Sequence, residues 1–353
     1  MPFHTVRNFV AMAFIAVGVP DSDADLVADV LVSADLRGIR SHGVARMSFF
    51  LVRLERGVIN QKPNLRFERG SETTGLLHGD NAIGVVAAAR GMEEAMSMAG
   101  RFGSGFVAVR NSSHFGYAGF WSQRAMREGF IGISMSNSGR RVAPTFSDES
   151  VLGTNPLSVT IAGGAGETDF FLDMATSPVA VGKVETALRE GREIPKGWVA
   201  EAGDTPILDD DGVLSYDAPL LPLGGEGDET GGHKGFGLSL MVELLCGALA
   251  GGGLADRILG ASGDAPAAMG HFLGAIKVAG FRPIELVQAD MAETFDLIRK
   301  SGRAPGRDRI FIHGEPEAIA EAENCELGIP ITPALMGQLR RWNSRLALGF
   351  DLA

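Results

Sequence analysis

The sequence predicts an α/β protein whose mixed α/β region follows a mostly helical beginning and precedes a helical end. Apolar residues recur at helical spacing through the first seventy or so residues. From residue 74 onward, short apolar runs typical of strands alternate with helical stretches. Helical periodicity returns over residues 316–348. The 48 glycines are spread along the whole chain, which indicates many tight turns and not a flexible linker.

Helical patterns dominate the start of the chain. We expect helices over residues 5–17, 21–36 and 44–56. Gly18 would end the first helix, and Ser22 with Asp25 three residues later resembles a capping box for the second. The third helix would carry Arg46 on its first turn. A glycine-containing polar segment separates the second helix from the third and is expected to form a turn.

The central region combines strands with helices. We expect strands over residues 74–78, 105–109, 131–135, 157–161, 169–174 and 271–278, and helices over residues 83–99, 118–127, 236–250 and 284–300. Residues 183–232 are rich in Gly, Pro and Asp. Because a structureless loop of that length is uncommon, this stretch should carry short elements and pack over a site.

Several common motifs are missing. The nearest match to G-x-G-x-x-G, residues 103–108, precedes a predicted strand, so its glycines cannot place a pyrophosphate at a helix N-terminus. Residues 227–234 lack the Gly-Lys pair and following Ser or Thr of a phosphate loop. The seven histidines form no HExxH pair. A Rossmann fold, magnesium-nucleotide chemistry and a metal site are therefore not expected.

Composition excludes further classes. The net charge of −11 argues against a nucleic-acid partner, which needs clustered Lys and Arg. Cys246 and Cys325 belong to no CxxC pair, so we expect no disulfide framework and a cytoplasmic location. Residues 9–20 lack the basic start and cleavage site of a signal peptide. The longest apolar run, residues 238–255, contains Glu243 and a glycine triplet, so it predicts a buried helix and no membrane partner.

Two polar clusters, residues 37–46 and 111–116, carry the candidate chemistry. Each places a histidine, His42 or His114, beside a hydroxyl in a glycine-flanked segment. Histidine can transfer a proton near neutral pH, and Arg46 can hold a carboxylate through two parallel hydrogen bonds. This combination suits redox chemistry on a 2-hydroxy or 2-keto acid. Taken alone, each histidine is more often an ordinary surface or buried residue than a catalyst, and Arg46 with His42 could form one exposed helix face.

A third candidate is the glycine-rich turn at residues 231–235, which opens an apolar helix. Backbone N–H groups at the positive end of that helix, together with Lys234, could bind an anion such as a cofactor phosphate. An ordinary turn with a solvated lysine explains the same residues. The motif alone leaves both interpretations open.

Seven short segments, taken together, are far more specific than any one of them. They are residues 34–46, 113–116, 153–157, 173–177, 194–198, 233–238 and 303–306. In this order they resemble the malate/L-lactate/sulfolactate dehydrogenase family. That family also contains ureidoglycolate dehydrogenase, 2,3-diketogulonate reductase and the cyclic-imine reductases. The resemblance covers nearly the whole chain.

The resemblance implies an NAD(P)-dependent oxidoreductase that acts on a small carboxylate and forms a homodimer. It implies a non-Rossmann, mixed-sheet NAD(P)-binding domain, residues 73–314. A second, mainly helical domain would be built from both chain ends, residues 1–72 plus 315–353, and would close over the substrate. The missing glycine fingerprint agrees with this fold.

Carried over by position, Arg46 resembles the carboxylate anchor, with Thr154 and His42 as further substrate contacts. The hydroxyacid branch uses the residue matching His114 as the base, whereas the imine-reductase branch uses His42, supported by Ser41. The resemblance also implies cofactor contacts from His114, Phe115, Gly116, Tyr117, Ala118, Ser138, Asp173, Met174, Ala175, Val181, Gly182, His233, Lys234, Arg303, Gly306 and Arg307.

Two departures from the family pattern affect the expected substrate. Lys183 stands where the imine reductases have an acidic residue, and residues 145–148 lack a Trp-Gly-Gly found in many members. We therefore expect hydride transfer between NAD(P) and C2 of a 2-hydroxy or 2-keto carboxylate, with His114 as the first choice of base. The alternatives are an NADPH-dependent reductase of a cyclic imine carboxylate and a non-catalytic small-acid binding protein.

Overall fold

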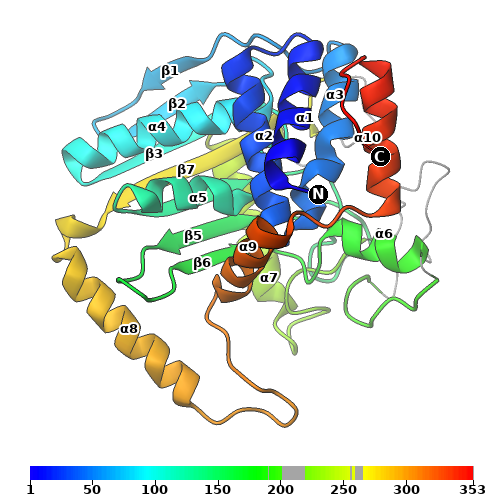
Figure 1. Ribbon diagram of the computed structural model, residues 1–353. Helices are drawn as coiled ribbons and strands as arrows, with labels where there is room; N and C mark the ends of the chain where they lie inside the picture. The colour runs from blue at the N-terminus through cyan, green and yellow to red at the C-terminus, as the bar shows by residue number, and fades with distance from the viewer. Residues whose placement is uncertain (190, 201–218, 255–256, 259–264, 353) are drawn as a thin grey trace.

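The computed structural model describes residues 1–353 except 190, 201–218, 255–256, 259–264 and 353 (Figure 1). Its helices are α1 (Phe3–Ala16), α2 (Asp21–Leu36), α3 (Met47–Glu55), α4 (Gly84–Phe102), α5 (Ala118–Arg127), α6 (Val181–Arg189), α7 (Gly232–Glu243), α8 (Ile284–Lys300), α9 (Glu315–Leu327) and α10 (Pro333–Arg345). Its strands are β1 (Arg66–Arg69), β2 (Thr74–His78), β3 (Ser104–Ser112), β4 (Phe130–Ser136), β5 (Leu157–Ile161), β6 (Phe170–Met174) and β7 (Met269–Lys277). In the described part of the chain, no helix is both long and apolar enough to span a membrane.

One mixed sheet forms the centre of the molecule. Its strand order is β1-β2-β3-β7-β4-β5-β6. Strands β2 and β3 are parallel, and every other neighbouring pair is antiparallel. The late strand β7 lies between β3 and β4. This order differs from a doubly wound sheet and confirms the predicted non-Rossmann α/β fold.

Helices cover both faces of the sheet. On one face α4 packs against β3 and β7, and α5 packs against β4 and β5 (Figure 1). On the other face lies α7, which continues into a π turn (Leu244–Ala248) against β7. The backbones meet so closely there that a Cβ on Gly270 would lie 1.8 Å from the carbonyl oxygen of Cys246. Only glycine fits at this crossing.

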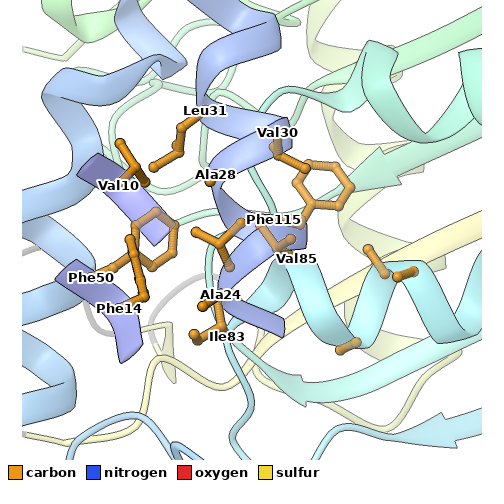
Figure 2. Close-up of a cluster of buried hydrophobic side chains, with 14 of the residues drawn as sticks. Val10, Phe14, Ala24, Ala28, Val30, Leu31, Phe50, Ile83, Val85 and Phe115 are labelled. Atoms are coloured by element: carbon orange, nitrogen blue, oxygen red, sulfur yellow. The ribbon is translucent and has the colours of Figure 1, made fainter. Parts of the chain in front are cut away.

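The helices from both chain ends share one core with α4. Figure 2 shows part of this cluster of buried side chains, which includes Val10, Phe14, Leu31, Phe50 and Phe115. The indole N–H of Trp342 in α10 donates to Ser48 Oγ at 2.6 Å, which ties the C-terminal helix to α3. The apolar stripes of α1, α2 and α3 therefore place the α2–α3 connection on a rigid support. The division into two domains stays a prediction.

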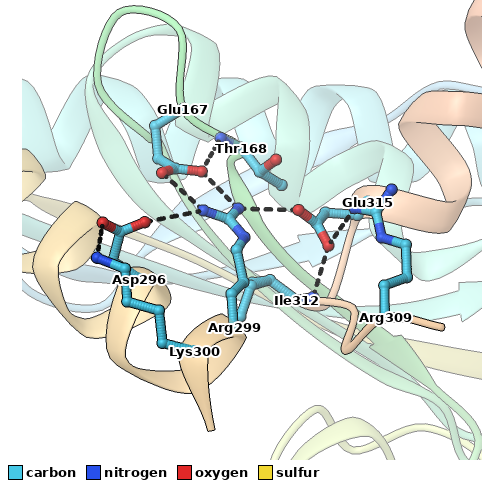
Figure 3. A network of polar contacts seen from close by, with 8 residues as sticks. All are labelled: Glu167, Thr168, Asp296, Arg299, Lys300, Arg309, Ile312 and Glu315. Atoms are coloured by element: carbon cyan, nitrogen blue, oxygen red, sulfur yellow. Dashed lines mark hydrogen bonds and ion pairs between the residues drawn. The ribbon is translucent and has the colours of Figure 1, made fainter. Parts of the chain in front are cut away.

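Helix α8 projects from the body of the molecule (Figure 1). Its C-terminal end is held by Arg299, which donates to Glu167 at 2.7 Å and to Glu315 at 2.8 Å (Figure 3). Glu167 lies in the β5–β6 connection, and Glu315 begins α9. One guanidinium thus joins three segments, and the loop from α8 to α9 starts from this anchor.

Several predicted elements need correction. The third helix begins at Met47, because Arg46 lies in a separate 3-10 turn (Val44–Arg46) that follows another (Arg40–His42). The capping box of Ser22 and Asp25 is wrong: α2 follows Pro20 and has no side-chain cap. Strand β1 was not predicted. The helix expected over residues 236–250 begins at Gly232 and changes to the π turn at Leu244.

Candidate active site

The turn that carries His42 is fastened to α2. Asp35 Oδ2 accepts a hydrogen bond from the Val44 backbone N–H at 2.8 Å, and burial raises the pKa of this carboxyl to about 6. A Cβ on Gly43 would lie 2.0 Å from Asp35 Oδ1, so glycine is required there. The local sequence therefore fixes His42 and Arg46 relative to the helix.

The segment that carries His114 is held from several sides. Ser113 Oγ donates to the Ala82 carbonyl at 2.9 Å and accepts from Gly84 N–H at 3.0 Å. The indole of Trp121 donates to the Phe115 carbonyl at 2.9 Å. These contacts tie the end of β3 to the starts of α4 and α5, which leaves His114 little freedom to move.

His42 and His114 are stacked on each other. Their ring centroids are 5.5 Å apart with an interplanar angle of 26°, and Phe49 and Phe50 each lie 5.9 Å from the His114 ring. Burial, reinforced by the charge of Arg46, lowers the pKa of His42 to about 3. Burial and the neighbouring cationic groups lower the pKa of His114 well below its usual value. Both rings are therefore neutral near pH 7.

The two rings offer different nitrogens to a ligand. The Gly116 backbone N–H donates to Nδ1 of His114 at 3.1 Å, so the neutral ring carries its proton on Nε2. Ser41 Oγ lies 2.9 Å from Nδ1 of His42. If this hydroxyl accepts from Nδ1–H, Nε2 of His42 keeps a free lone pair. His114 can thus donate a hydrogen bond, while His42 can accept a proton.

Arg46 stands beside this pair. Its Nε donates to the Ser41 carbonyl at 2.8 Å. Among the described residues its two terminal nitrogens make no hydrogen bond, so they form a fork of the kind that can bind a carboxylate. Burial lowers the pKa of Arg46, whereas the negative charge of Glu185 opposes this shift and the positive charge of Arg141 adds to it.

Helix α6 brings an acidic residue, Glu185, near Arg46, although position 183 on the same helix is a lysine. Lys183 is exposed at the start of α6, but Glu185, two residues later on the same helix, acts electrostatically on Arg46. The site thus has an acidic group from α6, which the sequence comparison at position 183 missed. Its influence falls on Arg46, and the charge that lowers the pKa of His42 is that of Arg46 itself.

A cavity of about 120 Å³ opens beside His114. Its polar wall includes Ser138 and Arg53, and its apolar wall includes Phe49 and Met269. The Arg53 guanidinium lies 3.9 Å from the centroid of the Phe49 ring. Apolar walls with a few polar groups suit a flat heteroaromatic ring. Sequence reasoning missed Arg53, since its neighbours in the sequence do not distinguish it from an exposed residue of a helix.

Ser138 and Thr154 lie together. The Thr154 backbone N–H donates to Ser138 Oγ at 3.1 Å, and the Thr154 carbonyl accepts from Thr176 N–H at 2.9 Å. The second bond connects this pair to the segment that begins with Asp173. Asp173 accepts from Gly119 N–H at 3.0 Å at the start of α5, and burial raises its pKa to about 7. Hydrogen bonds therefore connect Ser138, Thr154 and the segment that begins with Asp173.

Most of the remaining predicted cofactor residues fall into four groups. The side chains of Phe115, Tyr117 and Ala118 are buried in the protein core, so they can offer only backbone groups to a ligand. Those of His233 and Lys234 are exposed on the first turn of α7. The exposed loop between α8 and α9 contains Arg303, Gly306 and Arg307, and no hydrogen bond or ion pair in the described structure joins it to the other site residues. Val181 and Gly182 begin α6.

His271 is a buried histidine that sequence reasoning did not select. It contacts residues next to His114. His271 on β7 lies between Ser112 Oγ at 2.8 Å and Ser136 Oγ at 2.9 Å, and its ring stacks on Phe115 at 4.6 Å. Burial lowers its pKa to about 3. Its neighbours come from β3 and β4, so no local pattern could reveal it.

The donor set fits a dinucleotide better than a metal ion. The cavity beside His114 has room for a flat ring, and Lys234 places a cationic group, next to the exposed ring of His233, at the positive end of α7. Within the described ranges, His, Cys, Asp and Glu residues form no cluster of three or more suited to a metal.

Comparisons with known proteins agree along the whole chain. The family described as malate/L-lactate dehydrogenase matches residues 1–340. Malate dehydrogenase from Pyrococcus abyssi is 39% identical over 348 residues, which cover 99% of this chain and 95% of that protein. L-sulfolactate dehydrogenase from Methanocaldococcus jannaschii is 35% identical and covers 95% and 93%. The solved malate dehydrogenase from Pyrococcus horikoshii superimposes with a TM-score of 0.88 at 35% identity, covering 99% and 96%.

Other relatives differ in the substrate and cofactor that their names carry. Ureidoglycolate dehydrogenase (NAD(+)) from Escherichia coli is 33% identical, and (2R)-3-sulfolactate dehydrogenase (NADP(+)) from Chromohalobacter salexigens is 31% identical. The solved Δ1-piperideine-2-carboxylate reductase from Pseudomonas syringae superimposes with a TM-score of 0.79 at 25% identity. The similarity therefore extends over both branches that were considered from the sequence.

Proposed function

Because the chain belongs to the malate/L-lactate dehydrogenase family, we propose that it transfers hydride between NAD or NADP and C2 of a small 2-hydroxy or 2-keto carboxylate. It is an NAD(P)-dependent oxidoreductase. The observation that carries the proposed substrate class is the stacked pair of His42 and His114 beside the free guanidinium fork of Arg46. This arrangement supports the proposal because it would set a proton acceptor, an oxygen-binding donor and a carboxylate anchor next to one another.

Each residue has a distinct role in the oxidation direction. Arg46 holds the substrate carboxylate through its two terminal nitrogens. Nε2–H of His114 donates to the C2 oxygen, and Nε2 of His42 takes the hydroxyl proton. A bound nicotinamide cofactor would supply the hydride acceptor for C2. His114, Ser138 and the start of α7 would hold that cofactor.

This division of labour departs from the expectation that His114 is the base. A neutral His114 whose Nδ1 accepts from Gly116 N–H has no free lone pair on Nε2. His42 has one when Ser41 accepts its Nδ1 proton. The proposal therefore assigns proton transfer to His42 and polarisation of the oxygen to His114.

The first experiment is oxidation of NADH and NADPH, followed at 340 nm, with pyruvate, oxaloacetate, sulfopyruvate and piperideine-2-carboxylate. Turnover of an open-chain keto acid supports the proposal and identifies the cofactor. Turnover of the cyclic imine alone would replace the proposed substrate class by that of the reductase branch. Cofactor binding without turnover of any acid would favour a non-catalytic binding protein.

The roles are separated by three variants. Arg46→Ala should cost on the order of a few kcal/mol of transition-state stabilisation with every acid, because it removes a two-point contact. His42→Asn should abolish turnover while NADH still binds, whereas His114→Asn should leave slow turnover. If His114→Asn is the inactive variant and His42→Asn stays active, the assignment of the two histidines is reversed.

We also propose that two copies form a homodimer through α7 and the π turn. One side of α7 packs on the sheet, yet its solvent side is apolar as well, with Leu238, Leu240, Met241, Leu244 and Leu249 exposed. A helix that is apolar on all sides is normally covered. A second copy of the chain is the partner that the family resemblance implies.

The proposal extends to the division of the chain into domains and to its cellular compartment. We propose that residues 1–72 plus 315–353 form the helical domain and that residues 73–314 form the cofactor domain. His42 and Arg46 would then belong to the helical domain and His114 to the cofactor domain, so the substrate would lie between the two domains.

Cys246 and Cys325 are free thiols, which supports a reducing cytoplasm as the location.

A further inference from the structure

We propose that Glu243 is the positioning residue that fixes Ser138 and Thr154 in the site. Glu243 ends α7, and only 3% of its surface is exposed. Among the described residues that line the cavity beside His114 it is not found, and we assign it no catalytic role. The inference rests on the proposed function, since it concerns the residues assigned to substrate and cofactor.

The Glu243 carboxylate binds two buried asparagines, one on each oxygen. Oε1 accepts from Asn137 Nδ2 at 3.2 Å, and Oε2 accepts from Asn155 Nδ2 at 3.0 Å. The second hydrogens of these amides go to the carbonyls of Gly253 and Ser239, each at 3.0 Å. Both amide nitrogens are therefore fully used, and neither amide can flip without breaking two bonds.

The oxygen atoms of the two amides accept hydrogen bonds from backbone N–H groups. Asn137 Oδ1 accepts from Gly270 N–H at 2.9 Å, and Asn155 Oδ1 accepts from Ser138 N–H at 3.1 Å. Asn155 also has a positive φ of 33°, a conformation that its surroundings must maintain. Glu243 thus sets the direction in which Asn155 presents its oxygen to Ser138.

The chain of bonds ends in the candidate site. Ser138 Oγ accepts from Thr154 N–H, and the Thr154 carbonyl accepts from Thr176 N–H. Ser138 also lines the cavity beside His114. Glu243 belongs to α7, the helix whose first turn carries His233 and Lys234.

A carboxylate is required because both of its oxygens are acceptors. Glutamine has nearly the same shape but presents one NH2 group, which would meet the NH2 of one asparagine. That asparagine must then flip or lose a bond. If Asn155 flips, its NH2 faces Ser138 N–H, and the backbone of Ser138 loses its acceptor. The cost would fall on ligand positioning, and proton transfer at His42 would not change.

The test compares wild type with Glu243→Gln. We expect kcat/KM to fall by about 10–100-fold, mainly through KM, as positioning errors of this kind produce. The dissociation constant of NADH or NADPH, measured by fluorescence titration without substrate, should rise as well. The pH dependence of kcat should stay unchanged. Asn343→Asp is the control, because it breaks another two-ended amide clamp, between Asn343 and Phe350, and should lower Tm without changing KM.

The double variant Glu243→Gln with Asn155→Asp sharpens the test. It exchanges acid and amide, so the introduced glutamine can donate to the introduced aspartate, whose other oxygen still accepts from Ser138 N–H. We expect its kcat/KM to exceed the product of the two single effects by more than about twofold, the scatter of independent mutations. Wild-type KM values and cofactor affinity in Glu243→Gln, or purely additive losses, would overturn the inference. A wild-type enzyme that turns over no acid would refute the proposed function instead, and cofactor titration would still test Glu243.

Discussion

At the scale of single residues, burial lowers the basicity of His42 most, and the charge of Arg46 lowers it further. In the free protein, burial and this guanidinium together lower the pKa of His42 to about 3. A substrate carboxylate bound to Arg46 would offset the second effect. Its negative charge would also lie close enough to favour a protonated imidazole. The base is thus weak until its substrate arrives.

This coupling predicts two different pH profiles for the oxidation reaction. Activity should fall as the pH drops through the pKa of His42, because a protonated ring cannot accept the hydroxyl proton. The acid limb of kcat reports the complex and that of kcat/KM reports the free enzyme. We expect the limb of kcat to lie about one pH unit or more above that of kcat/KM. Limbs that coincide, or that lie in the opposite order, would show that Arg46 is not the carboxylate anchor.

At the scale of elements, local pattern predicts helices and strands well where the pattern is strong. The bounds of α5, β5 and α8 agree with those expected from apolar periodicity. Strand β1 was missed because three of its four residues, Arg66, Glu68 and Arg69, are charged, as suits an edge strand. The capping box expected for α2 was wrong because Pro20 occupies the N-cap position and no side chain caps the helix.

Only those site residues that lie in local sequence motifs could be predicted. His42, Arg46 and His114 were found from their neighbours in sequence. Glu185 and His271 were not, because α6 and β7 approach the site only through the long-range order of the sheet. Periodicity does not specify which distant strands pair. The central place of β7 between β3 and β4 is therefore a result of the structure alone.

The anchor of α8 leads to a prediction at this scale. Arg299→Met should release the end of α8 from Glu167 and Glu315 and increase proteolytic cleavage within residues 281–314. The loss of unfolding free energy should be small, about 1 kcal/mol, since the ion pairs are partly screened by solvent. Limited proteolysis with mass spectrometry measures the first effect, and urea unfolding measures the second.

Arg282→Met provides a matched control at the other end of α8. Its partner, Asp290, and Arg282 itself are both well exposed, so this pair should contribute little. Equal cleavage in the two variants would mean that Arg299 has no special part in holding the helix.

At the scale of the whole molecule, the site is assembled between layers. The helical layer supplies His42 and Arg46 on the turn after α2, and the sheet supplies His114, Ser138 and Thr154 at the ends of its strands. The shared core in Figure 2 joins α2, α3 and α4 through buried apolar side chains. Arg46 and Glu185 approach each other only because α6 follows the far edge of the sheet. The chemistry thus depends on the complete fold.

The exposed apolar side of α7 predicts the state of the molecule in solution. Wild type should have twice the 37.2 kDa mass of one chain in light scattering after gel filtration. Leu249, which is 61% exposed, lies beside a groove lined by Leu76, Phe106 and Phe272. Leu249→Glu would place a charge in a surface that a second copy must dehydrate, so the mass should fall to that of one chain at micromolar concentration. Leu327→Glu, at an exposed apolar residue on α9, should leave the dimer intact. A monomeric wild type, or dissociation by Leu327→Glu alone, would place the interface elsewhere and leave the apolar side of α7 without its proposed partner.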